Sequence, residues 1–114
     1  MVRDPRTYLE DVRQAADAIA SFVADKTLPD YQADLMLRSA VERQFEIIGE
    51  AVNQLTRCNP ELAARIPEGR RIVDFRNVLA HGYAVIDDAV VWQAVQQNLP
   101  SLRRSVESLL TSLP

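Results

Sequence analysis

The sequence predicts an all-α fold, an up-and-down bundle of four main helices plus a short helical turn. Apolar residues recur at alternating steps of three and four along most of the chain, the period of a helix with one buried face. Asp4-Pro5 and Asn59-Pro60 place a proline directly after a capping side chain, as at the start of a helix. The sustained two-residue alternation that is typical of strands is missing from the sequence.

Length and charge limit the classes of protein to consider. A chain of 114 residues suits one domain spanning 1–114 and is too short for two domains of ordinary size. Its formal net charge of -3 excludes a bulk positive field, so any contact with nucleic acid must be local. The segment from residue 65 to 76 is the one modestly basic stretch, with Arg65, Arg70, Arg71 and Arg76 against Glu68 and Asp74.

Cysteine content and hydropathy indicate the compartment. Cys58 is the single cysteine, which excludes an internal disulfide and fits a reducing environment. The first residues lack the apolar core of a signal peptide, and no apolar run approaches the roughly 20 residues that span a bilayer. We therefore expect a cytoplasmic protein that does not contact a membrane.

The first two helices are predicted from their caps and apolar stripes. Asp4 and Pro5 begin the first helix, and Leu28-Pro29-Asp30 marks a break and a new cap, after which a helix is expected from Tyr31 to about Leu55. The first helix has its apolar face at Tyr8, Val12, Ala15, Ile19 and Phe22. The second has two apolar stripes, at Val41, Phe45, Ile48, Val52 and Leu55 and at Met36, Ala40, Ile47 and Ala51. Since both must be buried, we expect a homodimer.

The second half of the chain is predicted to hold a short turn and two helices. The turn is expected at 61–65, and the next helix should begin near Glu68 and end at His81-Gly82. Its inward stripe is Ile72, Phe75 and Leu79. Asp87 or Asp88 should cap the last helix, with a kink near 96–100 because Pro100 cannot donate a hydrogen bond. That helix has its apolar residues at Trp92, Val95, Leu99, Leu102, Val106 and Leu109.

The end of the third predicted helix carries the residues best suited to chemistry. His81 is the only histidine, and its side chain can give and take a proton near neutral pH. Taken alone, a histidine at a helix end more often bonds the last carbonyls. Asn77 lies one turn before His81 and can orient the imidazole. Arg76 lies about 140° around the helix from His81, so these two side chains would meet across a dimer axis rather than within one helix.

The residue types match metal-free RNA cleavage. That reaction needs a base for the 2′-hydroxyl proton, an acid for the leaving oxygen and a cation for the phosphate charge. His81 could be the base, and a second imidazole or Tyr83 could be the acid. Arg76 could be the cation, since the planar arginine fork suits phosphate oxygens.

A polar strip on the second predicted helix leaves two interpretations open. Arg43, Glu46 and Glu50 follow one another at steps of three and four among apolar neighbours. They form either intrahelical salt bridges, worth a few tenths of a kcal/mol each, or the wall of a cleft. We expect no metal site, since the carboxylates have no second histidine nearby, and no cofactor, since three glycines at 49, 69 and 82 build no phosphate loop.

Several segments resemble one known family. Arg76, Asn77, His81 and Tyr83 form the signature Arg-Asn-x-x-x-His-x-Tyr of HepT-like toxins of the HEPN class. Tyr8-Leu9-Glu10-Asp11, the segments 40–43 and 46–51, and Val91-Trp92 resemble further hallmarks, so the similarity covers nearly the whole chain. The chain departs from the family in having Arg70-Arg71-Ile72 where members often carry a tryptophan.

The resemblance implies a function and a partner. It implies an HEPN-like, homodimeric toxin of a HEPN/MNT toxin–antitoxin pair that cleaves RNA through Arg76 and His81, with Asn77 as the orienting residue. The implied partner is an MNT-type nucleotidyltransferase antitoxin that inactivates the toxin by transferring AMP to Tyr83.

Two other readings use the same residues. The first is a non-catalytic dimeric helical adaptor that binds the nucleotidyltransferase and presents Tyr83 to it. The second is a structural partner protein in which the motif only caps a helix. Turnover of RNA in the presence of EDTA separates the enzyme from both.

Overall fold

The computed structural model describes residues 4–80 and 87–113, with side chains at 76–80 excepted. Every regular element in these ranges is helical, which confirms the predicted all-α class. The elements are α1 (Pro5–Phe22), α2 (Leu28–Ala33), α3 (Leu35–Cys58), α4 (Pro60–Ala63), α5 (Gly69–Ala80), α6 (Asp88–Gln93), a π-helical segment (Ala94–Asn98) and α7 (Leu99–Ser112).

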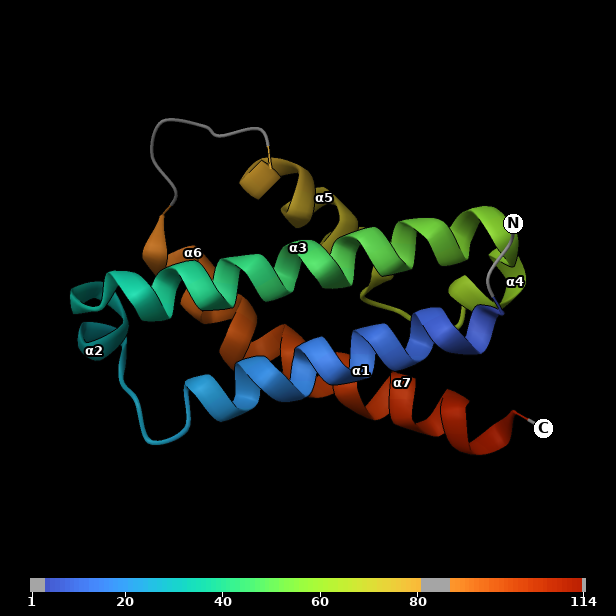
Figure 1. Ribbon diagram of the computed structural model, residues 1–114, viewed down its shortest axis with the longest axis horizontal. Helices are drawn as coiled ribbons and strands as arrows, with labels where there is room; N and C mark the ends of the chain where they lie inside the picture. The colour runs from blue at the N-terminus through green and yellow to red at the C-terminus, as the bar shows by residue number, and fades with distance from the viewer. Residues whose placement is uncertain (1–3, 81–86, 114) are drawn as a thin grey trace.

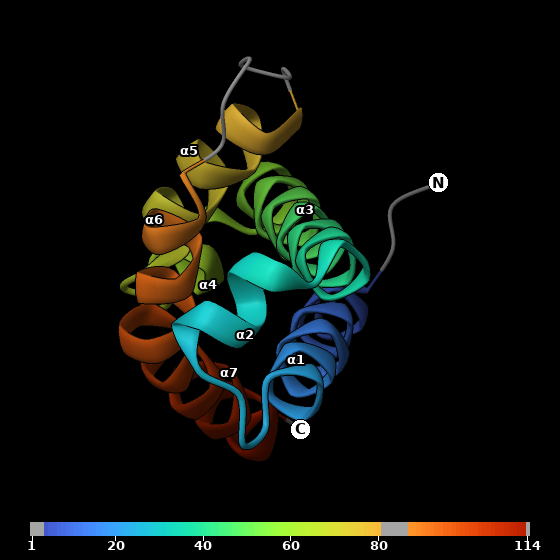
Figure 2. The same ribbon diagram turned by 90° about the vertical axis from the view of Figure 1, so that its left-hand side faces the viewer.

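The long helices run alternately in opposite directions (Figure 1). α3 packs against both α1 and α5, and α7 packs against α1 on the other side. The end-on view in Figure 2 shows α2 crossing one end of the bundle, where it contacts α3 and α6. α3 is therefore the central helix of the fold.

The core lies between α1, α3 and α7. Its fully buried side chains come from all three helices: Leu9, Val12 and Ile19, then Val41, Phe45, Ile48 and Leu55, then Leu102 and Val106. Complete burial of one such side chain contributes about 1.5–3 kcal/mol. The predicted face of α1 is confirmed except at Phe22, which is the last residue of the helix and is 38% exposed.

The predicted start of the second helix is wrong. Thr27 and Asp30 form a capping box that begins the short helix α2, with the Thr27 N–H donating to Asp30 Oδ2 at 2.9 Å. Asp34 then adopts extended backbone and accepts a hydrogen bond from the Leu37 N–H at 3.0 Å, which begins α3 separately. Two N-caps seven residues apart, Thr27 and Asp34, thus divide what periodicity alone joins into one helix.

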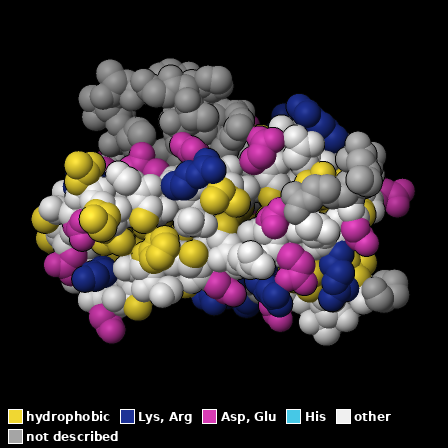
Figure 3. Space-filling view, in the orientation of Figure 1, with side chains coloured by type: hydrophobic (Ala, Val, Ile, Leu, Met, Phe, Trp, Pro, Cys, Tyr) yellow, Lys and Arg dark blue, Asp and Glu magenta, His cyan; other side chains and the backbone are white. Residues whose placement is uncertain are grey.

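The two apolar stripes predicted for this helix differ in burial. The stripe from Val41 to Leu55 is buried, as expected. Of the second stripe only Ala51 is buried, while Met36 is 82% exposed. The neighbouring Leu35 is 68% exposed as well. Hydrophobic side chains are visible at the surface at the left-hand end of Figure 3, the end where α2 lies and α3 begins.

The remaining caps and the irregularity at Pro100 lie where the sequence predicts them. Asn59 accepts a hydrogen bond from the Leu62 N–H at 3.1 Å, and Asp87 accepts one from the Ala89 N–H at 2.9 Å. Before Pro100 the chain passes through the π-helical segment, and a π-helical turn within a helix is one of the recognised causes of a kink.

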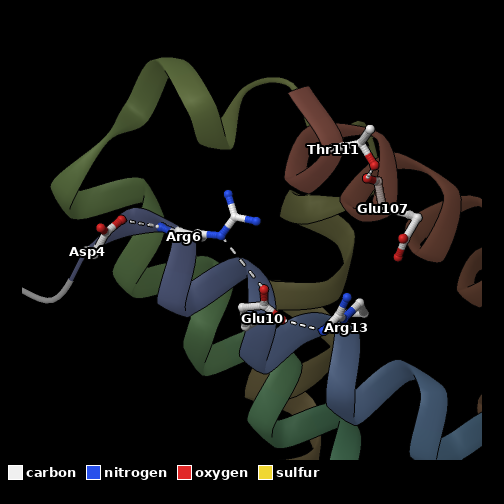
Figure 4. A network of polar contacts seen from close by, with 6 residues as sticks. All are labelled: Asp4, Arg6, Glu10, Arg13, Glu107 and Thr111. Carbon is white, nitrogen blue, oxygen red and sulfur yellow. Dashed lines mark hydrogen bonds and ion pairs between the residues drawn. The ribbon is translucent and has the colours of Figure 1, made fainter. Parts of the chain in front are cut away.

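The surface of α1 carries a ladder of charges (Figure 4). Asp4 Oδ1 accepts from the Arg6 N–H at 2.8 Å, and Glu10 pairs with Arg6 at 3.9 Å and with Arg13 at 2.6 Å. Such exposed pairs contribute little to stability. Across the described ranges, no helix is both long and apolar enough to cross a membrane.

Candidate functional site

α5, which carries the first half of the motif, lies antiparallel along α3. Near its beginning, a Cβ built on Gly69 would lie 3.2 Å from Val52 Cγ1, so the absence of a side chain at Gly69 permits this close approach. Near its middle, the Phe75 ring meets the Phe45 ring edge to face, with centroids 5.1 Å apart. Residue numbers rise along α5 as they fall along α3, which fixes the antiparallel register.

A hydrogen bond connects the residue before α5 to the last helix. Ser101 Oγ on α7 donates a hydrogen bond to Glu68 Oε1 at 2.7 Å, across a separation of 33 residues. Glu68 directly precedes α5. α7 therefore holds the beginning of α5, and α3 supports α5 along its length.

This register locates the motif backbone. Positions 76 and 77 directly follow Phe75, so by this register their backbone lies level with residues 43 and 44 of α3. The side chains of Arg76 and Asn77 lie outside the described part, and so do His81 and Tyr83 altogether. The structure thus places the backbone of two motif residues beside α3 and leaves the assembly of the four as a prediction.

The polar strip on α3 has partners of its own. Arg43 Nη1 lies 3.3 Å from Glu46 Oε2, and Glu50 Oε1 accepts a hydrogen bond from Gln54 Nε2 at 2.9 Å. The salt-bridge interpretation is therefore confirmed for Arg43 and Glu46. The Arg43 side chain is 67% exposed, so this pair contributes little to stability. The cleft-wall interpretation of Arg43, Glu46 and Glu50 stays a prediction.

Sequence reasoning missed a polar cluster next to the strip, where α2, α3 and α6 meet. Arg38 Nε lies 3.9 Å from Asp88 Oδ2, which ties the first residue of α6 to α3. Tyr31 is fully buried, and its ring lies 5.4 Å from the Trp92 ring. The Tyr31 hydroxyl is buried and finds no hydrogen-bond partner within the described ranges. The spacing of Arg38 and Glu42, one turn apart on α3, was the available signal.

Glu42 completes this cluster. Burial raises the pKa of its carboxyl, the neighbouring Asp88 and Glu46 raise it further, and Arg38 opposes the shift. The pKa of Tyr31 is raised as well, first by burial and then by Glu42 and Asp88. Arg38 therefore pairs with Asp88, and its charge also acts on the Glu42 carboxyl, beside the line of contact between α3 and α5, here called the α3–α5 seam.

Two of the grooves that described residues line run along the long helices, and a further one, of about 620 Å³, lies beside α2 and the beginning of α3. The larger, of about 860 Å³, lies between α1 and α7 away from α3 and α5, and two of its arginines are already paired, Arg13 with Glu10 and Arg103 with Asp17. The other, of about 540 Å³, lies on the α3–α5 seam near α4. Position relative to α5 favours the second groove, despite its smaller volume. Within the described residues, no three potential ligands gather to hold a metal ion.

Comparison with known proteins gives the family. The family model described as ribonuclease HepT-like matches residues 12–109. The chain belongs to the HepT-like ribonuclease family. It is 34% identical over 109 residues to the "Probable ribonuclease HepT" of Thermococcus cleftensis, covering 96% of this chain and 98% of that one.

A further relative is similar to the chain over nearly the same length. A Methanocaldococcus jannaschii protein that also carries an RNase name is 31% identical over 105 residues, covering 92% of this chain and 95% of the relative. No solved structure matches the chain. Because these relatives align over nearly their full length, the HepT-like match includes both α3 and α5, the two helices that border the seam.

Replacement of Glu42 by glutamine should stabilise the protein at pH 7. The raised pKa means that the folded state binds more protons than the unfolded state above the ordinary value of 4.5, so this carboxyl lowers stability as the pH rises through its folded pKa. Glutamine stays neutral throughout. Chemical denaturation should therefore show Glu42→Gln more stable than the original protein at pH 7, with the difference vanishing below about pH 4.

The exposed Glu61→Gln removes one carboxylate from the surface and serves as the control, which should not reproduce the gain in stability at pH 7. A Glu42→Gln protein that is less stable than the original at pH 7 would show that attraction to Arg38 outweighs burial.

Proposed function

We propose that this chain is a metal-independent RNA endonuclease that acts as a homodimer and is the toxin of a HEPN/MNT toxin–antitoxin pair. Membership of the HepT-like ribonuclease family supports the RNA-cleaving activity. The observation that best supports this assignment of the site is the register of α5 on α3, which brings the backbone of positions 76 and 77 level with Arg43, the first residue of the polar strip.

The proposed reaction needs only proton transfers and charge stabilisation. His81 takes the proton of the ribose 2′-hydroxyl, and the 2′-oxygen attacks the adjacent phosphorus. The bond to the 5′-oxygen breaks, and that oxygen receives a proton from the imidazole of the second subunit or from Tyr83. The products are a 2′,3′-cyclic phosphate and a 5′-hydroxyl end. Arg76 stabilises the charge on the phosphate, and Asn77 orients His81.

Dimerisation follows from helical geometry. On one ideal helix Arg76 and His81 diverge by about 140°, so a second copy is needed to bring guanidinium and imidazole groups together. Exposed apolar side chains on α3, Leu35 and Met36, support association of the protein. Such a dimer would bury both side chains.

The proposed regulation acts on Tyr83. A nucleotidyltransferase of the MNT type transfers AMP from ATP to the phenol oxygen, with release of pyrophosphate. The attached AMP brings a phosphate and a base into the cleft. Both bulk and negative charge then oppose the entry of RNA.

Arg76→Ala and His81→Ala should each abolish RNA cleavage while the protein stays folded. A positioned general base or acid is worth about 10²–10⁴ in rate, and loss of the arginine removes stabilisation of the phosphate charge. Gel analysis of RNA incubated with each variant in EDTA measures the loss, and circular dichroism checks the fold. Cleavage that persists in both variants, or that EDTA stops in the original protein, would contradict the proposal.

Tyr83→Phe should abolish modification and keep cleavage within about tenfold of the original rate, because the second imidazole can act as the acid. Co-expression with an MNT-type nucleotidyltransferase, followed by intact mass, measures the modification as increments of whole AMP units. Uptake of AMP by Tyr83→Phe at the original level would assign the acceptor to another residue. A normally modified protein that never cuts RNA would favour the adaptor function.

A further inference from the structure

We propose that the groove between α3, α4 and the first half of α5 binds a nucleotide of the single-stranded RNA substrate next to the site of cleavage. This inference rests on the proposed function and extends it to a specific subsite. With a volume of about 540 Å³, the groove lies within the range of pockets for small ligands, about 300–1,000 Å³.

The groove continues the proposed cleft along both helices. On α3, Asn53 lines it and follows Glu46 and Glu50 at steps of four and three, so the polar strip leads directly into it. On α5, Arg70 and Asp74 line it and share one side of the helix with position 77, at steps of four and three. Since the two helices are antiparallel, both runs lead from the motif toward the groove.

Arg70 supplies a cation available for a phosphate. It is exposed, and none of the ion pairs among the described residues involves it. The arginines of the α1–α7 groove differ, since Arg13 and Arg103 already pair with carboxylates. Binding a phosphate at Arg70 therefore breaks no existing ion pair within the described part of the chain.

The spacing fits an RNA strand that passes through the cleft. Arg76 follows Arg70 by six positions, a rise of about 9 Å along the helix axis and a turn of about 120° around it, so the strand would cross the helix obliquely between the two arginines. A stacked strand advances roughly 3.4 Å per nucleotide, so 9 Å corresponds to about two to three stacked nucleotides and to fewer in an extended strand. A phosphate at Arg70 thus lies close along the strand to the one that is cleaved.

The other walls suit a base and a ribose. The half-buried Val73 and the exposed Pro60 and Pro67 give the groove apolar surface on which a base can rest. Asn53 offers an amide donor and acceptor, and Asp74, the one carboxylate among the lining residues, can accept from a ribose hydroxyl or a base amino group. Because Asp74 repels phosphate, it confines the phosphate to the Arg70 end.

Arg70→Ala should weaken the binding of RNA, and Arg71→Ala is the matched control. The two arginines are adjacent, exposed and equally charged, but Arg71 borders a different depression beside α6. Binding is measured in a His81→Ala background, so that the RNA stays intact, by the fluorescence anisotropy of a short fluorescein-labelled RNA of mixed sequence. Arg70→Ala should raise Kd about tenfold and lower the slope against the logarithm of salt concentration by about 0.7.

A variant that fills the groove tests the site without a change of charge. Ala64 lines the groove and is exposed, so Ala64→Trp should occupy its volume and weaken RNA binding, whereas Ala24→Trp, exposed in the turn after α1, should not. Equal losses for Arg70→Ala and Arg71→Ala, or unchanged RNA binding by Ala64→Trp, overturn the inference. A changed oligomeric state of Ala64→Trp with unchanged RNA affinity assigns the groove to a protein interface instead.

Cleavage kinetics separate this inference from the proposed function. With His81 restored, Arg70→Ala should raise KM about tenfold and leave kcat within twofold, as expected for a contact made equally in the ground and transition states. A protein that binds RNA through Arg70 but never cuts it overturns the proposed function alone. A protein that cuts RNA with equal KM in Arg70→Ala and Arg71→Ala overturns the subsite alone.

Discussion

The antiparallel packing of α5 on α3 is the constraint on which the rest of the structure depends. Gly69 lets the beginning of α5 approach Val52, and the edge-to-face contact of Phe75 with Phe45 fixes its middle. Together these two contacts determine both the direction and the register of α5. Because the motif begins one residue after Phe75, hydrophobic packing sets the position of its first two residues along α3.

The polar features of the molecule are arranged along this seam. At the motif end lie the Arg43–Glu46 pair and the cluster of Arg38, Glu42 and Asp88, which ties α6 to α3. At the other end lies the groove bordered by Arg70. An acidic protein can therefore present a local RNA-binding path, since its net charge of -3 says little about the charges along one seam.

Much of the fold could be predicted from local signals, because caps and helical periodicity are encoded within a few residues. Asp4, Asn59 and Asp87 cap helices as expected, whereas the division at Asp34 was missed because Asp30 supplied an equally good cap signal nearby. The Phe45–Phe75 contact and the Arg38–Asp88 pair join residues that are 30 or more positions apart. The groove is formed by three separate helices, α3, α4 and α5. No spacing rule predicts them, because tertiary packing alone brings these residues together.

The most direct test of the central claim, that two subunits share each cleft, mixes two inactive proteins. Consider a mixed dimer of one Arg76→Ala subunit and one His81→Ala subunit, in which each of two clefts takes its arginine from one subunit and its histidine from the other. One cleft then keeps both residues, and the other cleft lacks both. Random exchange makes half of the dimers mixed, and each mixed dimer keeps one arginine–histidine cleft. With Tyr83 as the acid in place of the missing second imidazole, up to about a quarter of the original RNase activity should return. If subunit exchange is verified by native mass spectrometry and the mixture stays as inactive as either variant alone, the shared cleft is contradicted.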